Sequence, residues 1–167
     1  MSKNCNNLIR AFKVYIRPLL EYASPIWSPC QVSQIIALES VQRKFTKRIP
    51  GLHHLPYGVR LARLNLHTLE HRRLIYDLVL CFKIVHGCSS LLFSDFFTFT
   101  TNKTSRGHPY RLSPPLLKSN LHKFSFSYRI VSSWNSLPEN IVTASNVVVF
   151  KHHLLKQDLS KFLIIPF

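Results

Sequence analysis

One uninterrupted segment, Asn65 to Gly87, constrains the fold of this 167-residue chain more than any other. It contains no proline and no internal glycine, so its backbone favours a continuous helix. Thr68 suits the N-cap position, and Gly87 suits the left-handed position that follows a helix. The main apolar face runs from Leu74 to Val85, and further apolar residues lie on the opposite side. We therefore expect a central helix that its neighbours bury on most of its surface.

Several further segments have helical spacing and end at proline or glycine. The predicted helices are Asn7–Tyr22, Val32–Ile49, Tyr57–Leu64, Phe124–Asn135 and a last helix with Ser145 as its N-cap. Pro18 should kink or restart the first helix, because proline lacks the amide hydrogen that a helix interior needs. Ser24–Pro29 contains two prolines and predicts a turn. The start of Phe124–Asn135 also alternates like a strand, but its length and the following Leu137-Pro138 favour a helix.

A small β-hairpin is the one departure from helix that the sequence predicts. Phe96–Thr100 is rich in β-forming residues, and Tyr110–Leu112 could pair with it across the intervening loop. The expected fold class is therefore mainly α, a helical bundle with a small hairpin around residues 96–113. We expect two regions, a helical one over 1–90 and a C-terminal one over 91–167 that holds the hairpin and two helices.

The excess of positive charge limits the partners of the chain. There are 22 Lys and Arg against 7 Asp and Glu, a net charge of +15, and 46% of the residues are hydrophobic. A folded chain with this charge is expected to bind a polyanion, either nucleic acid or an acidic membrane surface. No apolar run approaches the ~18 residues of a transmembrane helix. Four cysteines and no secretory start predict an intracellular protein, in the nucleus or the cytoplasm.

The segment Val32–Ile49 offers the best local candidate for binding. It is predicted to bury one apolar stripe, formed by Ile35, Leu38, Val41, Phe45 and Ile49. Arg43, Lys44, Lys47 and Arg48 fall together on the opposite arc, within the last two turns. These cations either form a solvated face that complements the helix C-terminus or contact phosphates. Arg72 and Arg73 are secondary candidates for the same contact.

No catalytic or cofactor-binding motif is visible. His67, Glu70 and His71 match the H-x-x-E-H pattern of inverted zinc peptidases, but His67 precedes the expected cap Thr68, which makes zinc ligation by a helical pair doubtful. The seven acidic residues are isolated from one another, whereas two-metal catalysis needs clustered carboxylates. Four widely spaced glycines exclude a phosphate-cradling loop. We expect no enzyme activity, no cofactor, no metal and no small-molecule substrate.

Several short motifs, in the same order along the chain, resemble one family. They are Arg17-Pro18-Leu19-Leu20-Glu21-Tyr22-Ala23 with Trp27-Ser28-Pro29, Leu38–Lys47, Arg63–Leu66 with Leu69–Arg73, Asp77-Leu78, His86-Gly87, Arg106-Gly107-His108, Phe126 with Arg129-Ile130-Val131, and Trp134-Asn135-Ser136-Leu137-Pro138. This pattern, from about Arg10 to Lys151, resembles the thumb and post-thumb region of non-LTR (LINE-type, jockey-like) retrotransposon reverse transcriptases. Gly58 departs from it, since the family tends to a better helix former there.

The resemblance implies a non-catalytic fragment of an RNA-directed DNA polymerase. The polymerase carboxylates of that family lie in the palm and its endonuclease lies further upstream, so no catalytic residue is carried over to this chain. A thumb grips the template–primer duplex, which implies RNA or an RNA–DNA duplex as partner and the palm of the parent element as a second. The alternatives are a translated relic without a function of its own, and a protein that binds acidic membranes through Val32–Ile49.

Overall fold

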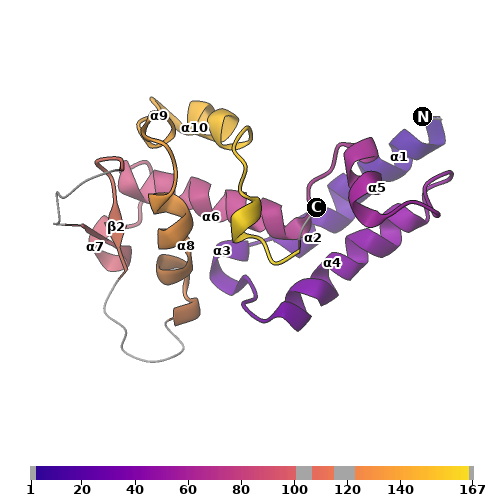
Figure 1. Cartoon of the computed structure of the whole chain (residues 1–167), viewed down its shortest axis with the longest axis horizontal. Coiled ribbons are helices and arrows are strands. Elements are labelled where there is room, and N and C mark those ends of the chain that lie inside the picture. Colours follow the sequence, from indigo (N-terminus) through magenta and orange to yellow (C-terminus); the bar gives the residue numbers. More distant parts are fainter. Residues whose placement is uncertain (1–2, 101–106, 115–122, 166–167) are drawn as a thin grey trace. The chain divides into compact units, whose positions relative to one another are not determined.

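The computed structural model describes residues 3–100, 107–114 and 123–165, drawn as ribbon in Figure 1. The described residues are mainly helical and include one two-stranded antiparallel sheet, so the predicted fold class is confirmed. The longer helices are α1 (Lys3–Ala11), α4 (Val32–Lys47), α5 (Tyr57–Leu64), α6 (Leu69–Val85), α8 (Phe126–Asn135) and α10 (Val147–Leu154). The shorter elements are the π-helical η1 (Phe12–Ile16), α2 (Arg17–Glu21), α3 (Ser24–Trp27), α7 (Phe93–Phe96), β1 (Thr98–Phe99), β2 (Leu112–Ser113), α9 (Glu139–Val142) and the 3-10 helix η3 (Ser160–Phe162).

The chain forms two compact units, and each is described by itself. Unit 1 comprises the residues up to Arg73 together with the segment from Leu163, and unit 2 runs from Leu74 to Phe162. The division falls inside α6 and not after residue 90, where the sequence placed it. The reason is that the buried side chains of α6 from Ile75 onwards pack in one core with the elements that follow α6 in the chain.

The N-terminal helix changes its winding before Pro18. The N–H of Arg17 donates to the carbonyl of Phe12, five residues back, which widens the turn that precedes the proline. α2 then begins with Pro18 in its first turn, where the missing amide hydrogen is tolerated. This confirms the predicted restart. The predicted turn after it is wrong in one respect, because Ser24–Trp27 forms the short helix α3.

Unit 1 is held by a small apolar core around α4 and α5, which lie against each other (Figure 1). Its buried members are Cys5, Ile9, Ile49, Leu52, Leu61, Leu64 and Leu66. The N-terminal helix joins this core through Phe12, whose ring stacks on that of Phe45 with 4.3 Å between centroids. α5 forms over the predicted residues despite Gly58 in its first turn.

The central helix α6 begins and ends where the sequence predicts. The side chain of Thr68 accepts a hydrogen bond from the N–H of His71 at 3.1 Å, as an N-cap does. Gly87 adopts a φ of +65°, and its N–H donates to the carbonyl of Ile84. The N–H of Cys88 donates to the carbonyl of Lys83 at 2.7 Å, which completes a Schellman motif. Every apolar side chain of α6 is buried or half-buried, as expected.

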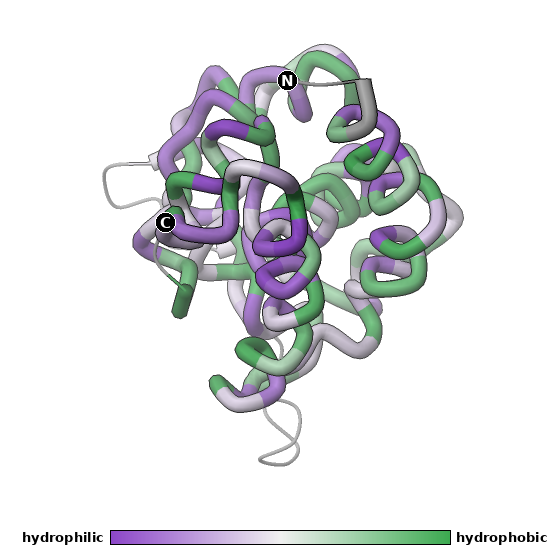
Figure 2. The backbone as a smooth tube through the Cα atoms, turned by 90° about the vertical axis from the view of Figure 1, so that its right-hand side faces the viewer, coloured by the Kyte–Doolittle hydropathy of each residue, from purple (hydrophilic) through white to green (hydrophobic). Residues whose placement is uncertain are grey.

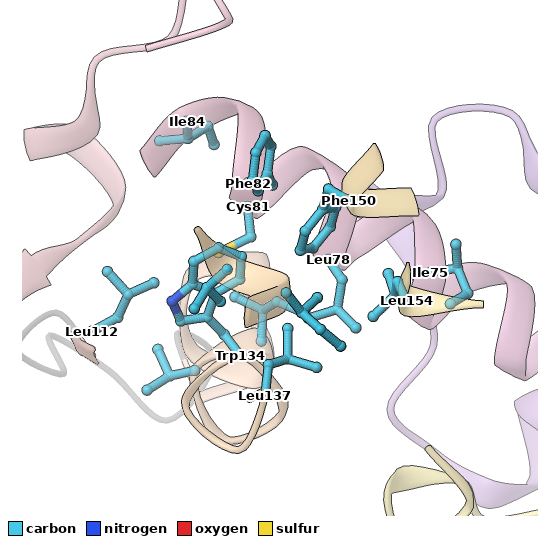
Figure 3. Close-up of a cluster of buried hydrophobic side chains, with 14 of the residues drawn as sticks. Ile75, Leu78, Cys81, Phe82, Ile84, Leu112, Trp134, Leu137, Phe150 and Leu154 are labelled. Atoms are coloured by element: carbon cyan, nitrogen blue, oxygen red, sulfur yellow. The ribbon is translucent and has the colours of Figure 1, made fainter. Parts of the chain in front are cut away.

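Unit 2 has the larger core, drawn in Figure 3 around Trp134. The rings of Phe82 and Phe150 stack at 4.3 Å, and the indole N–H of Trp134 donates to the carbonyl of Tyr110 at 2.8 Å. The side-chain amide of Asn135 makes two hydrogen bonds to the backbone of Leu112, at 2.9 and 2.8 Å. Side chains of α8 thus hold the predicted hairpin, in which Thr98 pairs with Ser113 and Phe99 with Leu112.

The end of unit 2 corrects one prediction. The N-cap of α10 is Asn146 and not Ser145, because the side chain of Asn146 accepts from the N–H of Val149 at 2.9 Å.

Hydrophobic and hydrophilic residues alternate along the helices of the chain (Figure 2). No helix of the described part combines the length and the apolarity that crossing a bilayer demands.

Candidate nucleic-acid interface

The four cations predicted on the C-terminal half of α4 are all exposed. Arg43, Lys44 and Lys47 lie in the last turns of the helix, and Arg48 is its C-cap residue. None of them forms an ion pair with an acidic residue in the part of the chain that the structure describes. The structure therefore brings these four residues to one exposed end of one helix, where no carboxylate of the described residues pairs with them. We call them the α4 basic face.

The opposite side of α4 is partly polar, which corrects the predicted apolar stripe, although Ile35 and Ile49 of that stripe are buried. Its buried residues are Ile35, Glu39, Gln42 and Thr46, while Leu38 and Phe45 are half-buried and Val41 is exposed. A polar face can be buried only when its groups find hydrogen-bond partners. Those partners come from α5 and from the start of α6.

Glu39 provides the first of these contacts. Its carboxylate accepts hydrogen bonds from the N–H of Leu69, at 2.9 and 3.2 Å, and from the hydroxyl of Tyr57. The N–H of Leu69 is one of the amides at the start of α6 that the helix itself cannot satisfy. Gln42 adds hydrogen bonds from its amide nitrogen to the Tyr57 hydroxyl at 3.0 Å and to the carbonyl of His67 at 2.9 Å. α4 is thus fixed to the N-terminus of α6.

Burial is the main influence on the pKa values of Glu39 and Tyr57. It raises the pKa of Glu39 above its ordinary value, although the Tyr57 hydroxyl, the backbone amides and the charge of Arg73 act in the opposite direction. The pKa of Tyr57 is also raised, first by burial and then by its hydrogen bond to Glu39. Tyr57 therefore stays protonated and donates to the carboxylate.

Arg60 of α5 holds the basic end of α4 in place through hydrogen bonds. Its guanidinium is buried and donates to the Thr46 hydroxyl at 3.2 Å and to the carbonyls of Arg43 and Leu55 at 3.3 and 3.1 Å. The guanidinium carbons of Arg43 and Arg60 lie 4.9 and 5.5 Å from the centre of the Tyr57 ring. Arg43 is therefore oriented by an aromatic ring, while its charge stays accessible.

Arg72 and Arg73 do not belong to the α4 basic face. Arg72 is half-buried, and its guanidinium forms a two-point ion pair with the carboxylate of Glu21, one contact being 2.9 Å long. Arg73 is only 2% exposed. Both were predicted as secondary contacts, and this prediction is wrong for Arg73, because a buried guanidinium cannot reach a phosphate. The sequence shows that both are cationic but not that α6 is buried on their side.

The H-x-x-E-H residues are used for structural contacts. The rings of His67 and His71 stack with 4.6 Å between centroids. The two carboxylate oxygens of Glu70 accept from the N–H groups of Ile164 and Ile165, each at 2.9 Å. Among the described residues, no three His, Cys, Asp or Glu side chains are grouped so as to hold a metal ion. Burial, with the charges of His67 and Arg72, lowers the pKa of His71 to about 4.

The polar network was missed at the sequence level, although its spacing is regular. Glu39, Gln42 and Thr46 recur at intervals of three and four residues, which places them on one helical face. Such a row of polar residues at helical spacing, next to an apolar row, is the signal that a buried polar face leaves in a sequence.

Comparison with known proteins adds no identification. No protein family matches the chain, no curated protein matches it, and no solved structure matches its fold. The candidate site is therefore defined by its geometry, which is a helix anchored by buried hydrogen bonds whose exposed end carries four cations.

Proposed function

We propose that this chain is a non-catalytic region of a non-LTR retrotransposon reverse transcriptase, corresponding to its thumb, and that it binds RNA or an RNA–DNA duplex. The α4 basic face contacts the phosphates. The observation that carries the proposal is the exposure of Arg43, Lys44, Lys47 and Arg48 at one helix end without a described acidic partner. Phosphate contacts of this kind give affinity with little sequence preference.

The anchoring of α4 supports this assignment. A flexible cation loses conformational entropy when it binds, whereas a fixed helix presents its charges already in place. The buried contacts of Glu39, Gln42 and Thr46 hold the helix, and the Tyr57 ring orients Arg43. The net charge of +15 adds long-range attraction to any polyanion.

The test is a salt-dependent titration of the purified chain against a labelled RNA–DNA duplex. The variant replaces Arg43, Lys44, Lys47 and Arg48 by Ala. Each phosphate contact contributes about 0.9 to the slope of log affinity against log salt, so the variant should lose a slope of about 3 to 4. A slope equal to that of the wild-type chain would remove the α4 basic face as the binding site.

A second variant controls for the loss of charge itself. Lys123, Lys151, Lys156 and Lys161 are exposed and lie in unit 2, so replacing these four by Ala removes the same charge elsewhere. This variant should keep most of the wild-type slope. An equal loss in both variants would mean that binding depends on net charge and not on the α4 basic face.

The same samples test the alternatives. Flotation with anionic liposomes, in the absence of duplex binding, would favour a membrane-surface protein. A folded chain that binds neither duplex nor liposomes at low salt would favour a relic whose charge has no partner.

A further inference from the structure

A second group of cations surrounds a hollow in unit 1, away from α4. The hollow has a volume of about 530 Å³ and lies between the N-terminal helix and the end of α5. Its lining includes Arg10 and Lys13 from the first of these and Arg63 from the second. Ile9 and Leu64 contribute apolar surface to it.

No described residue of unit 1 balances the charge around this hollow. None of the described residues that line it is acidic, and neither Arg10, Lys13 nor Arg63 forms an ion pair with an acid of the described chain. Three like charges around one space repel one another, and an anion bound among them would relieve that repulsion. The side-chain amides of Asn6 and Asn65 lie at the same hollow and add hydrogen-bond donors.

The local backbone is compatible with this arrangement. Lys13 lies in the π-helical η1, and such wide turns occur frequently at functional sites. The end of α5 would disfavour an anion if its carbonyl groups were free. Two of them are already used, because the carbonyls of Leu61 and Ala62 accept from the N–H groups of Leu66 and Asn65 at 3.0 and 3.2 Å.

A neighbouring aromatic residue indicates which phosphate compound fits. A second, smaller hollow of about 360 Å³ shares Arg10 and Val14 with the first and is lined by Tyr15. Tyr15 is 73% exposed, so its ring is open to stacking. Cationic groups next to an exposed ring are the usual means of holding a single-stranded nucleotide by its phosphate and its base.

We infer that this hollow binds a phosphate group of a nucleotide through Arg10, Lys13 and Arg63, with the base on Tyr15. The site is separate from the α4 basic face. The phosphate part of the inference is independent of the proposed function, whereas the assignment to a nucleic-acid strand rests on it.

The test is a calorimetric titration of the full chain with inorganic pyrophosphate and with adenosine monophosphate. Replacing Arg10, Lys13 and Arg63 by Ala should weaken binding of both at least tenfold, because charge-assisted hydrogen bonds are lost. The matched control replaces Lys123, Lys151 and Lys156 by Ala and should bind as the wild type does. Should the triple variant fail to fold, Arg63→Ala alone should weaken pyrophosphate binding at least threefold.

Two comparisons separate this site from the α4 basic face and from lipid. The variant without the α4 cations should bind pyrophosphate normally, whatever its affinity for duplex. Tyr15→Leu should weaken binding of adenosine monophosphate about fivefold or more and leave pyrophosphate binding unchanged. The proposed phosphate site would be overturned if the wild-type chain did not bind pyrophosphate, or if the triple variant bound pyrophosphate as tightly as the wild type. Retention on phosphatidic acid vesicles that adenosine monophosphate does not compete for would overturn the nucleotide assignment.

Discussion

The carboxylate of Glu39 is completely buried and lies between α5 and α6. A buried charge is costly unless hydrogen bonds replace the lost water. Here the Tyr57 hydroxyl and the N–H of Leu69 replace it, and the second of these would otherwise be an unsatisfied group at a helix start. The same hydrogen bonds therefore satisfy two buried groups, the carboxylate of Glu39 and the N–H of Leu69 at the start of α6.

Replacing Glu39 should destabilise the chain strongly. Glu39→Ala leaves the Tyr57 hydroxyl and the N–H of Leu69 buried without their acceptor, so the free energy of unfolding should fall by about 3 kcal/mol. Glu39→Gln keeps an acceptor oxygen and should cost less. Urea denaturation followed by circular dichroism measures both. Glu139→Ala at an exposed position should change stability by less than about 0.5 kcal/mol. Equal stability of Glu39→Ala and the wild type would show that the network contributes nothing.

His71 should make the chain less stable in acid. Its pKa is lowered to about 4 in the folded chain, against 6.5 for an ordinary histidine, so the unfolded chain binds its proton more tightly. The stability that His71 contributes is complete above the unfolded pKa and is lost as the pH falls from about 6.5 towards about 4. The loss reaches about 3 kcal/mol. Urea denaturation over this pH range measures it.

The matched variant for this effect is His71→Phe. It keeps a ring against His67 and cannot be protonated. Glu39 acts in the opposite direction, because its raised pKa makes the folded chain bind its proton more tightly, so its contribution is largest in acid and decreases as the pH rises. The difference between wild type and variant at each pH removes this background. Parallel stability curves would contradict the role of His71.

At the level of the elements, α6 ends at a position whose left-handed backbone favours glycine. Gly87 has a φ of +65°, and a Cβ built there meets no other atom within 4 Å. Gly87→Ala should therefore cost only the strain of the left-handed backbone, about 1 kcal/mol, without any steric clash. Thermal unfolding measures the loss. Asn at the same position tolerates this backbone better, so Gly87→Asn should lose less. A variant Gly87→Ala as stable as the wild type would contradict the expected cost of the left-handed backbone at this position.

Helix positions were predictable because they depend on local chemistry. The cap Thr68, the stop Gly87 and the break at Pro18 each act within one turn of the chain, and each is where the sequence places it. The buried face of α4 was not predictable in the same way. Apolar residues at helical spacing normally mark the core side, but here Val41 is exposed and Gln42 is buried, because Tyr57 and the start of α6 supply polar partners. That choice depends on residues 15 or more positions away.

At the level of the whole molecule, the candidate site was predictable only in part. The exposure of Arg43, Lys44, Lys47 and Arg48 follows from their arc on a surface helix, and the structure agrees. The burial of Arg73 and the convergence of Arg10 and Arg63 on one hollow depend on how distant segments fold together. Composition gives the number of cations, whereas the fold decides which of them remain open to a ligand.

The large positive charge also governs how copies of the chain behave towards each other. Four apolar residues between η1 and α3 are unusually exposed, on both sides of the helix break at Ala23: Tyr15 73%, Leu19 79%, Tyr22 81% and Ile26 86%. Exposed apolar side chains of this size promote association, whereas a charge of +15 opposes it. Salt screens the repulsion and leaves the hydrophobic attraction in place. Association should therefore increase with salt, which is the opposite of the salt dependence expected for phosphate binding.

Sedimentation velocity at about 0.05 M and about 0.5 M salt tests this balance, since the screening length falls from above 10 Å to a few ångströms over that range. The average mass of the sedimenting species should rise with salt for the wild-type chain. The double variant Leu19→Gln with Ile26→Gln should remain monomeric, because it removes apolar surface without changing the charge. Val148→Gln with Leu155→Gln alters two exposed apolar residues of unit 2 and should associate as the wild type does. Association that weakens with salt would instead mean that charged groups hold the copies together.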